Sequence, residues 1–404
     1  MKKILILGGA SGQVKLIKAS KDAGYYVVLC DYTKTNPGIK LADKHYQVST
    51  MDYDAVLEVA KKEKIDGVIS NSEPAMINVA KLSEELNLVG NPSSSIETLI
   101  SKDKFRNLEE KLKLFAPKHY ITDNLEDFLK KLQEFKYPVI IKPVLSSGSR
   151  GTTKLESFNE EKAIKAFNTC KEFSRNNYCS IEEFVNSSIN YVIEGDVFVY
   201  KDYYFWEGMF FNYRHSSFKM IPTTESWPFI VSNSLFDEIK NSIKKIFTEL
   251  NITFGEYNVE MYLNDCNELF IIEINPRQGG YDIPDSIKKY SSIDFSKLLV
   301  TLAVGDEDYF KEANKIPKSN KIFTRHVVFS KKAGILEGIY IDDKIKKYVT
   351  KVEYVKKLNE KVPISQNGSD LIAFIDITFD TYENQKKYDF EMEKYIYPIL
   401  KEEE

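Results

Sequence analysis

The most informative stretch of the sequence is Asn258-Val-Glu-Met-Tyr-Leu-Asn-Asp-Cys-Asn-Glu-Leu-Phe-Ile-Ile-Glu-Ile-Asn-Pro-Arg277. Its alternating apolar and polar residues predict two strands joined by a tight polar turn. If Cys266 and Asn267 form a two-residue loop, counting back along both strands places Glu260 opposite Glu273. Two facing carboxylates repel each other and destabilise a strand pair. This pairing therefore indicates that something positive lies between them.

Asn275 extends the same polar face, because it lies two residues beyond Glu273 and alternate residues of a strand share a face. The neighbours Ile272 and Ile274 are expected to point the other way, into a core. Oxygen ligands at this density suit Mg²⁺ that holds a nucleotide phosphate. The alternative is an ordinary hairpin with one wet face, on which like charges are tolerated.

The size and charge of the chain limit the class of protein to which it can belong. With 404 residues it is expected to form two or three domains with ample core. A formal net charge of -4 gives no reason to expect nucleic acid or an acidic membrane as a partner, and no apolar run is long enough to span a bilayer. Four cysteines without metal-type spacing indicate free thiols in a reducing cytoplasm: Cys30, Cys170, Cys179 and Cys266.

The pattern of elements predicts a fold of mixed α/β and α+β class in three parts. Residues 1–100 alternate strands and helices, which is typical of a doubly wound parallel sheet. Residues 101–315 mix strands with helices and form a central α+β domain, which includes one helix over 287–304. Residues 316–404 contain short β-rich runs and a final helix, and we expect a small β-rich C-terminal domain.

Two further segments have the composition of a nucleotide site. The strand 138–143 ends near Lys142 and is followed by the small-residue loop 146–151. Such a loop can bring backbone N–H groups close to phosphate oxygens, and a lysine adds a point charge. The extended segment 180–185 offers backbone groups and Glu182 to an adenine edge. The alternatives are a flexible surface hairpin and an ordinary strand.

The N-terminal glycines suggest a different cofactor. Gly8-Gly-Ala-Ser-Gly12 follows a strand, and Asp31 ends the next strand, as in a dinucleotide-binding fingerprint. The glycine spacing differs from that fingerprint, and any tight strand–helix turn also uses glycines. A nicotinamide-dependent oxidoreductase is therefore kept as one alternative.

The order of these motifs resembles the ATP-grasp superfamily, in the branch with carbamoyl-phosphate-synthetase-like domains and L-amino-acid ligases. The resemblance covers residues 1 to about 310, and the C-terminal tail looks like the small third domain of that family. Its specific part is Glu260 followed by Ile272-Glu-Ile-Asn-Pro-Arg277.

This resemblance implies a role for each matching residue. The nucleotide contacts would be Lys104, Lys142, Ser146, Ser147, Gly148, Ser149, Arg150, Gly151, Glu182, Glu183 and Val185. One or two Mg²⁺ ions, with Mn²⁺ as an alternative, would bind Glu260, Glu273 and Asn275. Arg277 would act at the transferring phosphoryl group or the substrate carboxylate. The acidic residue that usually binds ribose has no clear match, and Asn190 and Glu194 are both candidates.

The implied activity is that of an ATP-dependent carboxylate–amine ligase that forms an acyl phosphate and releases ADP and phosphate. A bicarbonate-phosphorylating enzyme of the same fold and a non-catalytic nucleotide-binding subunit are the alternatives. Residues 211–218, 223–227 and 278–281 are candidate walls of the substrate site. Arg214 could hold a carboxylate there or lie in a surface loop. A homodimer is suggested by analogy alone.

Overall fold

The computed structural model describes residues 1–146, 150–214, 221–366 and 368–401. Its N-terminal part is a parallel sheet in the order β3-β2-β1-β4. Ile4, Leu5, Ile6 and Leu7 of the inner strand β1 are fully buried, as expected where helices cover both faces of a parallel sheet. The strand order reverses at β1, which confirms the predicted doubly wound arrangement. The strands are β1 (Lys3–Leu7), β2 (Tyr26–Cys30), β3 (Lys44–Tyr46) and β4 (Gly67–Ile69), and the helices are α1 (Val14–Asp22), α2 (Tyr53–Glu63), α3 (Met76–Leu86) and α4 (Ser93–Ile100).

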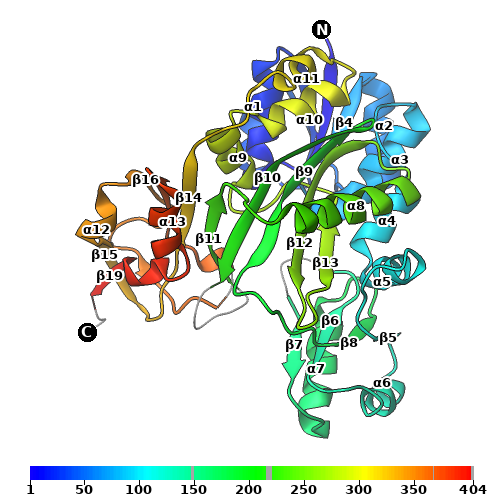
Figure 1. Cartoon of the computed structure of the whole chain (residues 1–404). Coiled ribbons are helices and arrows are strands. Elements are labelled where there is room, and N and C mark those ends of the chain that lie inside the picture. The colour runs from blue at the N-terminus through cyan, green and yellow to red at the C-terminus, as the bar shows by residue number, and fades with distance from the viewer. Residues whose placement is uncertain (147–149, 215–220, 367, 402–404) are drawn as a thin grey trace.

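The centre of the molecule is an antiparallel sheet in the order β13-β12-β9-β10-β11-β14-β18-β16 (Figure 1). Val197 and Val259 of one face form a core with helix α8 (Asn233–Glu249). The first five strands in this order are β13 (Leu269–Asn275), β12 (Phe254–Leu263), β9 (Val192–Tyr200), β10 (Tyr203–Arg214) and β11 (Pro222–Trp227). The last three are β14 (Ile322–Val328), β18 (Ala373–Phe379) and β16 (Val349–Tyr354).

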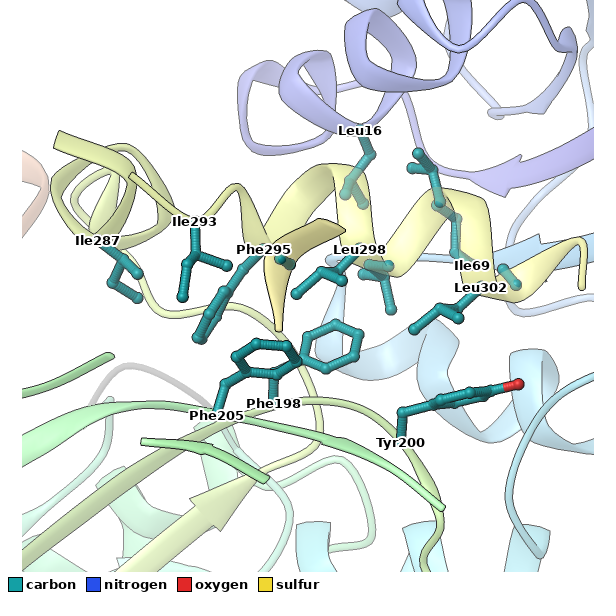
Figure 2. Close-up of a cluster of buried hydrophobic side chains, with 14 of the residues drawn as sticks. Leu16, Ile69, Phe198, Tyr200, Phe205, Ile287, Ile293, Phe295, Leu298 and Leu302 are labelled. Carbon is teal, nitrogen blue, oxygen red and sulfur yellow. The ribbon is translucent and has the colours of Figure 1, made fainter. Parts of the chain in front are cut away.

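The other face of this sheet packs on the N-terminal domain through helix α10 (Phe295–Ala303), as Figure 2 shows. Phe198 and Phe205 of the sheet contact Phe295 of that helix edge to face, with ring centroids 5.7 and 6.1 Å apart. A Cβ at Gly67 would lie 2.4 Å from the Ala303 carbonyl oxygen, so α10 lies against β4 only because residue 67 is glycine. The predicted helix over 287–304 is two helices, α9 (Ile283–Ser291) and α10, since Ser292 adopts a left-handed conformation (φ 67°).

A smaller antiparallel sheet, in the order β5-β8-β6-β7, lies beside the β12–β13 hairpin (Figure 1). Its apolar face packs against helices α6 and α7, and α5 connects it to the N-terminal domain. The elements are α5 (Lys102–Lys111), β5 (His119–Thr122), α6 (Leu125–Leu132), β6 (Val139–Pro143), β7 (Thr153–Leu155), α7 (Glu160–Phe173) and β8 (Cys179–Glu183).

The C-terminal region is β-rich, as predicted, but it is not fully separate. Strands β14, β18 and β16 continue the central sheet, because the free edge of β11 pairs with β14. The remaining strands form a three-stranded sheet in the order β17-β15-β19. The remaining elements are α11 (Asp308–Ala313), β15 (Gly334–Ile341), α12 (Asp343–Lys346), β17 (Lys361–Val362), α13 (Tyr382–Asp389) and β19 (Ile396–Lys401). The boundaries at residues 100 and 315 stay predictions.

Two further predictions concern the state of the cysteines and the presence of membrane-spanning helices. All four cysteines are free thiols, as predicted. Among the helices that the structure describes, none has both the length and the apolar character needed to cross a bilayer.

Candidate active site

A cavity of about 320 Å³, here called the main cavity, lies between the smaller sheet and the β12–β13 end of the central sheet. Most of the predicted site residues meet there. Those in its wall are Lys142, Ser146, Arg150, Glu182, Glu183, Val185, Glu260, Glu273 and Arg277. They come from segments more than a hundred residues apart, so their convergence is a property of the tertiary structure.

The β12–β13 hairpin places Glu260 directly opposite Glu273, as predicted. The predicted route to this pairing was wrong in two places. The turn is longer, because Asn264 rather than Asp265 closes it: Asn264 N donates to Glu268 O at 3.0 Å. A β-bulge at Ile272 then shifts the register by one residue and restores the Glu260–Glu273 pair.

The same bulge corrects the expectation for Ile272. A bulge adds one residue to a strand and breaks the alternation of its side chains. As a result, Ile272 lines the main cavity beside Glu273, whereas Ile271 and Ile274 lie in the hydrophobic core. The floor of the cavity is therefore partly apolar.

The two facing carboxylates differ in their electrostatic surroundings. Burial would raise the pKa of Glu273, but Lys102, a hydrogen bond from Asn275 and Arg277 hold that pKa below its ordinary value. Burial raises the pKa of Glu260, although the guanidinium of Arg214 opposes the shift. Asn275 donates from Nδ2 to Glu273 Oε1 at 2.8 Å, and it lines a smaller cavity next to the main one.

Lys142 and Glu182, which also line the main cavity, form a buried ion pair. Lys142 Nζ lies 2.7 Å from Glu182 Oε2, and Arg106 Nε donates to the same oxygen at 3.4 Å. Burial lowers the pKa of Lys142 to about 8, although Glu182 opposes this shift. Burial would raise the pKa of Glu182, but Lys142 and Arg106 bring it to about 2. Because Glu182 pairs with both Lys142 and Arg106, its carboxylate positions Lys142. Its predicted contact with adenine stays a prediction.

Lys104 does not lie where the resemblance predicts. It pairs with Glu97 at 3.0 Å, its side chain is half exposed, and it lies outside the wall of the main cavity. Lys102, at the start of the same helix, lines the cavity and donates from Nζ to the Ser146 carbonyl at 3.1 Å. A helix turns about 100° per residue, so a shift of two positions places a side chain on nearly the opposite side. The sequence did not separate these two lysines.

The predicted phosphate loop is only partly described. Ser147, Gly148 and Ser149 lie outside the described residues. Ser146 and Arg150 line the main cavity, and Ser146 Oγ donates to the Arg150 carbonyl at 3.4 Å. Gly151 does not line it. Its φ of 75° and the close approach of Phe173 and Pro143, each 2.9 Å from an added Cβ, explain why glycine is needed there.

Arg277 joins the hairpin to the N-terminal domain. Its Nη1 donates to the Gln278 carbonyl at 2.7 Å, and its Nη2 lies 4.0 Å from Glu73 Oε2. Glu73 also pairs with Arg175 at 3.1 Å and is 5% exposed, and burial raises its pKa. Glu73 was missed from sequence because its helical surroundings gave no local signal.

Arg214 is a site residue and not a surface-loop arginine. It ends β10, lines the main cavity, and lies 3.1 Å from Glu260 and 3.6 Å from Glu194. The ribose candidates stay open: Asn190 is exposed and Glu194 is buried, and neither belongs to the cavity wall.

The N-terminal glycine turn is organised around Asp31. The Asp31 carboxylate accepts from Gly9 N at 2.7 Å, Asn36 Nδ2 at 2.7 Å and Thr33 N at 2.8 Å. The acid and the glycine N–H that a dinucleotide would need therefore satisfy each other. These hydrogen bonds within the turn argue against a nicotinamide-dependent oxidoreductase.

Comparisons with known proteins agree with this geometry. Residues 135–285 match the family described as ATP-grasp domain, and residues 4–92 match the PylC-like N-terminal domain. The chain is 26% identical over 281 residues to the formate-dependent phosphoribosylglycinamide formyltransferase of Prochlorococcus marinus, which covers 68% of this chain and 70% of that protein. It is 25% identical over 312 residues to the alanine–anticapsin ligase of Bacillus amyloliquefaciens, covering 72% and 65%. The solved L-amino acid ligase of Bacillus licheniformis has the same fold, with a TM-score of 0.79 over 99% of both chains at 18% identity.

Proposed function

The chain belongs to the ATP-grasp superfamily, and from its cavity we propose that it is an ATP-dependent carboxylate–amine ligase. In the first step a substrate carboxylate oxygen attacks the γ-phosphorus of ATP, the bond to the β-phosphate oxygen breaks, and ADP leaves. In the second step an amine nitrogen attacks the acyl phosphate carbon, phosphate leaves, and the nitrogen loses a proton. The names of the relatives, which include a formate-dependent enzyme and two ligases, support a carboxylic acid as substrate.

The observation that carries the proposal is the composition of the main cavity. Lys102, Lys142 and Arg277 line it together with Glu260 and Glu273. Phosphoryl transfer requires little covalent help from a protein and depends on positioning and on neutralising charge. The cavity supplies cations for phosphate oxygens beside oxygen ligands for a metal ion, which a purely structural cluster would not need.

The residues present fit a divalent ion. Glu260 and Glu273 face each other across two strands, and Asn275 adds an amide oxygen beside them. Three oxygen donors leave room for phosphate oxygens and water in the coordination shell, as Mg²⁺ prefers. When bound, the ion would neutralise charge on the β- and γ-phosphates.

The side chains of the chain would carry the remaining roles. Lys142 and Lys102 would bind phosphate oxygens as point charges. Arg277 would orient the attacking carboxylate or the transferring group, because a guanidinium matches two oxygens at once. The walls of the cavity would exclude water, which otherwise hydrolyses an acyl phosphate.

A bicarbonate-phosphorylating enzyme is the second candidate, since the same cavity could hold this smaller acid. Release of ADP or phosphate with ATP and Mg²⁺ separates the two. Amino acids would be offered singly and in pairs, and bicarbonate in a separate arm. Release that requires one acid and one amine supports the ligase. Release with bicarbonate alone replaces it by the second candidate, and absence of release in every arm contradicts both.

A further inference from the structure

A row of polar side chains crosses the central sheet from the main cavity toward the C-terminal strands. At the cavity end, Glu273, Glu260 and Glu194 lie in register on β13, β12 and β9. At the other end, Asn212, Glu225, Arg325 and Asp376 lie in register on β10, β11, β14 and β18. Asn212 joins the two halves by donating from Nδ2 to Glu194 Oε2.

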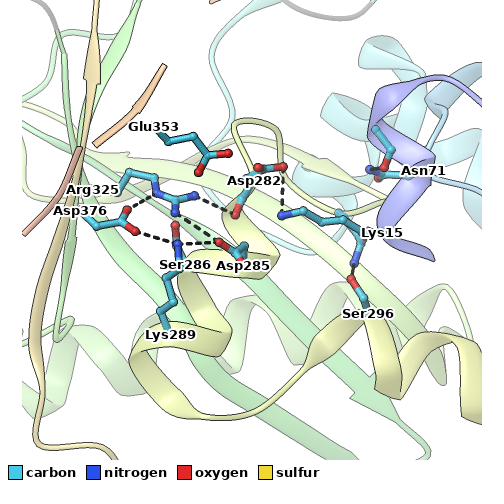
Figure 3. Close-up of polar contacts among 12 residues, drawn as sticks. Lys15, Asn71, Asp282, Asp285, Ser286, Lys289, Ser296, Arg325, Glu353 and Asp376 are labelled. Carbon is cyan, nitrogen blue, oxygen red and sulfur yellow. Dashed lines mark hydrogen bonds and ion pairs between the residues drawn. The ribbon is translucent and has the colours of Figure 1, made fainter. Parts of the chain in front are cut away.

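Both ends of this row are well paired. At the cavity end, Arg214 forms ion pairs with Glu260 and Glu194. At the far end, Figure 3 shows Arg325 and Lys289 between Asp376 and Asp285. The distance from Arg325 Nε to Asp376 Oδ1 is 2.8 Å, and Lys289 Nζ lies 2.7 Å from a carboxylate oxygen of each aspartate.

In the middle of the row, the hydrogen bonding of the described side chains is incomplete. Within the described residues, Glu225 Oε1 and Asn212 Oδ1 have no hydrogen-bond partner, although both side chains are only 1% exposed. The other Glu225 oxygen accepts from Ser286 Oγ at 3.5 Å, its one hydrogen bond in the described part of the chain. Leaving a buried acceptor unsatisfied costs about 1–3 kcal/mol. Directly paired residues have Cβ atoms about 5 Å apart, so one small group can reach both oxygens.

We propose that Asn212 and Glu225 form a subsite for a protonated primary amine on the substrate. Both free atoms are acceptors, so the group that satisfies them must donate at least two hydrogens. An ammonium has three and carries a charge. A hydroxyl has only one, and a carboxylate or phosphate would be repelled. This proposal rests on the proposed ligase function, because the subsite would bind part of the substrate of that reaction.

The local charge favours an ammonium over a neutral amide. Glu260 and Glu194 share the cation Arg214, whereas Glu225 forms no ion pair in the described structure. Arg325 is already opposed by Asp376 and Asp285, and no hydrogen bond joins it to Glu225 in the described structure. Burial and the neighbouring acids raise the pKa of Glu225, although Arg325 opposes the shift. A bound cation would offset this unfavourable field.

The position of the subsite indicates which part of the substrate binds to it. Glu225 lies three strands from Glu260, which corresponds to about 14 Å at the usual strand spacing. The group that it binds is therefore distant from the reacting phosphoryl group. Arg214 and Glu194 connect the two places, since Arg214 lines the main cavity and Glu194 accepts from Asn212. The subsite selects a substrate with a second amino group at its far end.

Isothermal titration in the presence of Mg²⁺ and a non-hydrolysable ATP analogue tests this subsite without requiring turnover. The probes are L-2,4-diaminobutyrate, L-ornithine and L-lysine, compared with norvaline, norleucine and L-glutamate. We expect at least one diamino acid to bind the full-length protein about tenfold or more tightly than its neutral counterpart. Glu225→Gln should abolish that preference and leave the affinity for the ATP analogue unchanged.

Asp389→Asn is the matched control, because Asp389 is a second buried acid that binds Thr324 of the same sheet. It should keep the preference of the wild type. The subsite is refuted if the wild type does not discriminate, or if Glu225→Gln discriminates as well as the wild type does. The ligase function is tested separately, by measuring ADP release on the same samples. A preference for diamino acids without ADP release would retain the subsite and reject the ligase.

Discussion

Arg106 donates from Nη2 to the main-chain carbonyl of Ile272 at 2.6 Å, which is the bulge residue next to the candidate metal ligand Glu273. The same guanidinium donates to the Ile271 carbonyl at 3.0 Å and pairs with Glu182 and Glu109. Arg106 is 1% exposed. One buried cation therefore connects helix α5, the Lys142–Glu182 pair and the bulge that restores the Glu260–Glu273 register.

Replacing Arg106 by methionine should lower the free energy of unfolding by about 3 kcal/mol or more, because two buried carboxylates lose their partner. Urea denaturation measures this loss. Lys111→Met is the matched control on the same helix, since Lys111 forms an exposed pair with Glu249. Such a pair contributes about 1 kcal/mol or less. Equal losses in the two variants would contradict the role given to Arg106.

Glu273→Gln should reduce ATP turnover by roughly 100-fold or more, because it removes a charged ligand beside the transferring phosphate. The thermal midpoint should change little, since the side chain keeps its shape. Glu268→Gln, at the turn of the same hairpin, is the control and should turn over ATP normally. Full activity in Glu273→Gln would reject the metal assignment.

Lys102 and Lys104 offer a test of the structure against the sequence-based resemblance. Lys102→Ala should raise the dissociation constant for ATP about tenfold or more, which is the effect of losing one charge-assisted hydrogen bond. Lys104→Ala should leave it within about twofold. Titration with ATP and Mg²⁺ gives both constants, and the reverse order of effects would favour the resemblance.

The value of kcat/KM for ATP should fall as pH rises through about 8, where Lys142 loses its proton. The fall should approach tenfold per pH unit if the charged form binds phosphate. The effect on folding has the opposite sign. Because burial lowers this pKa from 10.5, the unfolded chain binds more protons between pH 8 and 10.5, so stability rises with pH in that window.

Steady-state kinetics between pH 7 and 9.5 measures the first effect. Lys142→Arg is the control, since arginine stays charged throughout this range. A wild-type profile that matches the Lys142→Arg profile would show that the charge of Lys142 does not control ATP use.

Local pattern predicted the hairpin, and the Glu260–Glu273 pair was predicted correctly because the longer turn and the bulge at Ile272 offset each other. Alternation along each strand places Glu273 and Asn275 on one face whatever the exact turn, since side chains repeat every two residues. The turn itself was predicted wrongly because the Asn264 side chain closes it, accepting from Cys266 N and Glu268 N at 2.9 Å. The bulge at Ile272 was not predicted; its carbonyl accepts from Arg106, which is 166 residues away in the chain. A contact between residues so far apart in the chain cannot be recognised from a short stretch of sequence.

The class of fold, the order of the motifs and the residue types of the candidate site could all be predicted from the sequence. The tertiary arrangement was needed to show which lysine enters the cavity, that Glu73 lies near Arg277 and that Arg214 lines the cavity. It also shows that, among the described residues, Asn212 Oδ1 and Glu225 Oε1 on paired strands have no hydrogen-bond partner. The reason is physical. Periodicity and propensity act over a few residues, whereas burial and charge pairing join strands and helices that are far apart in the chain.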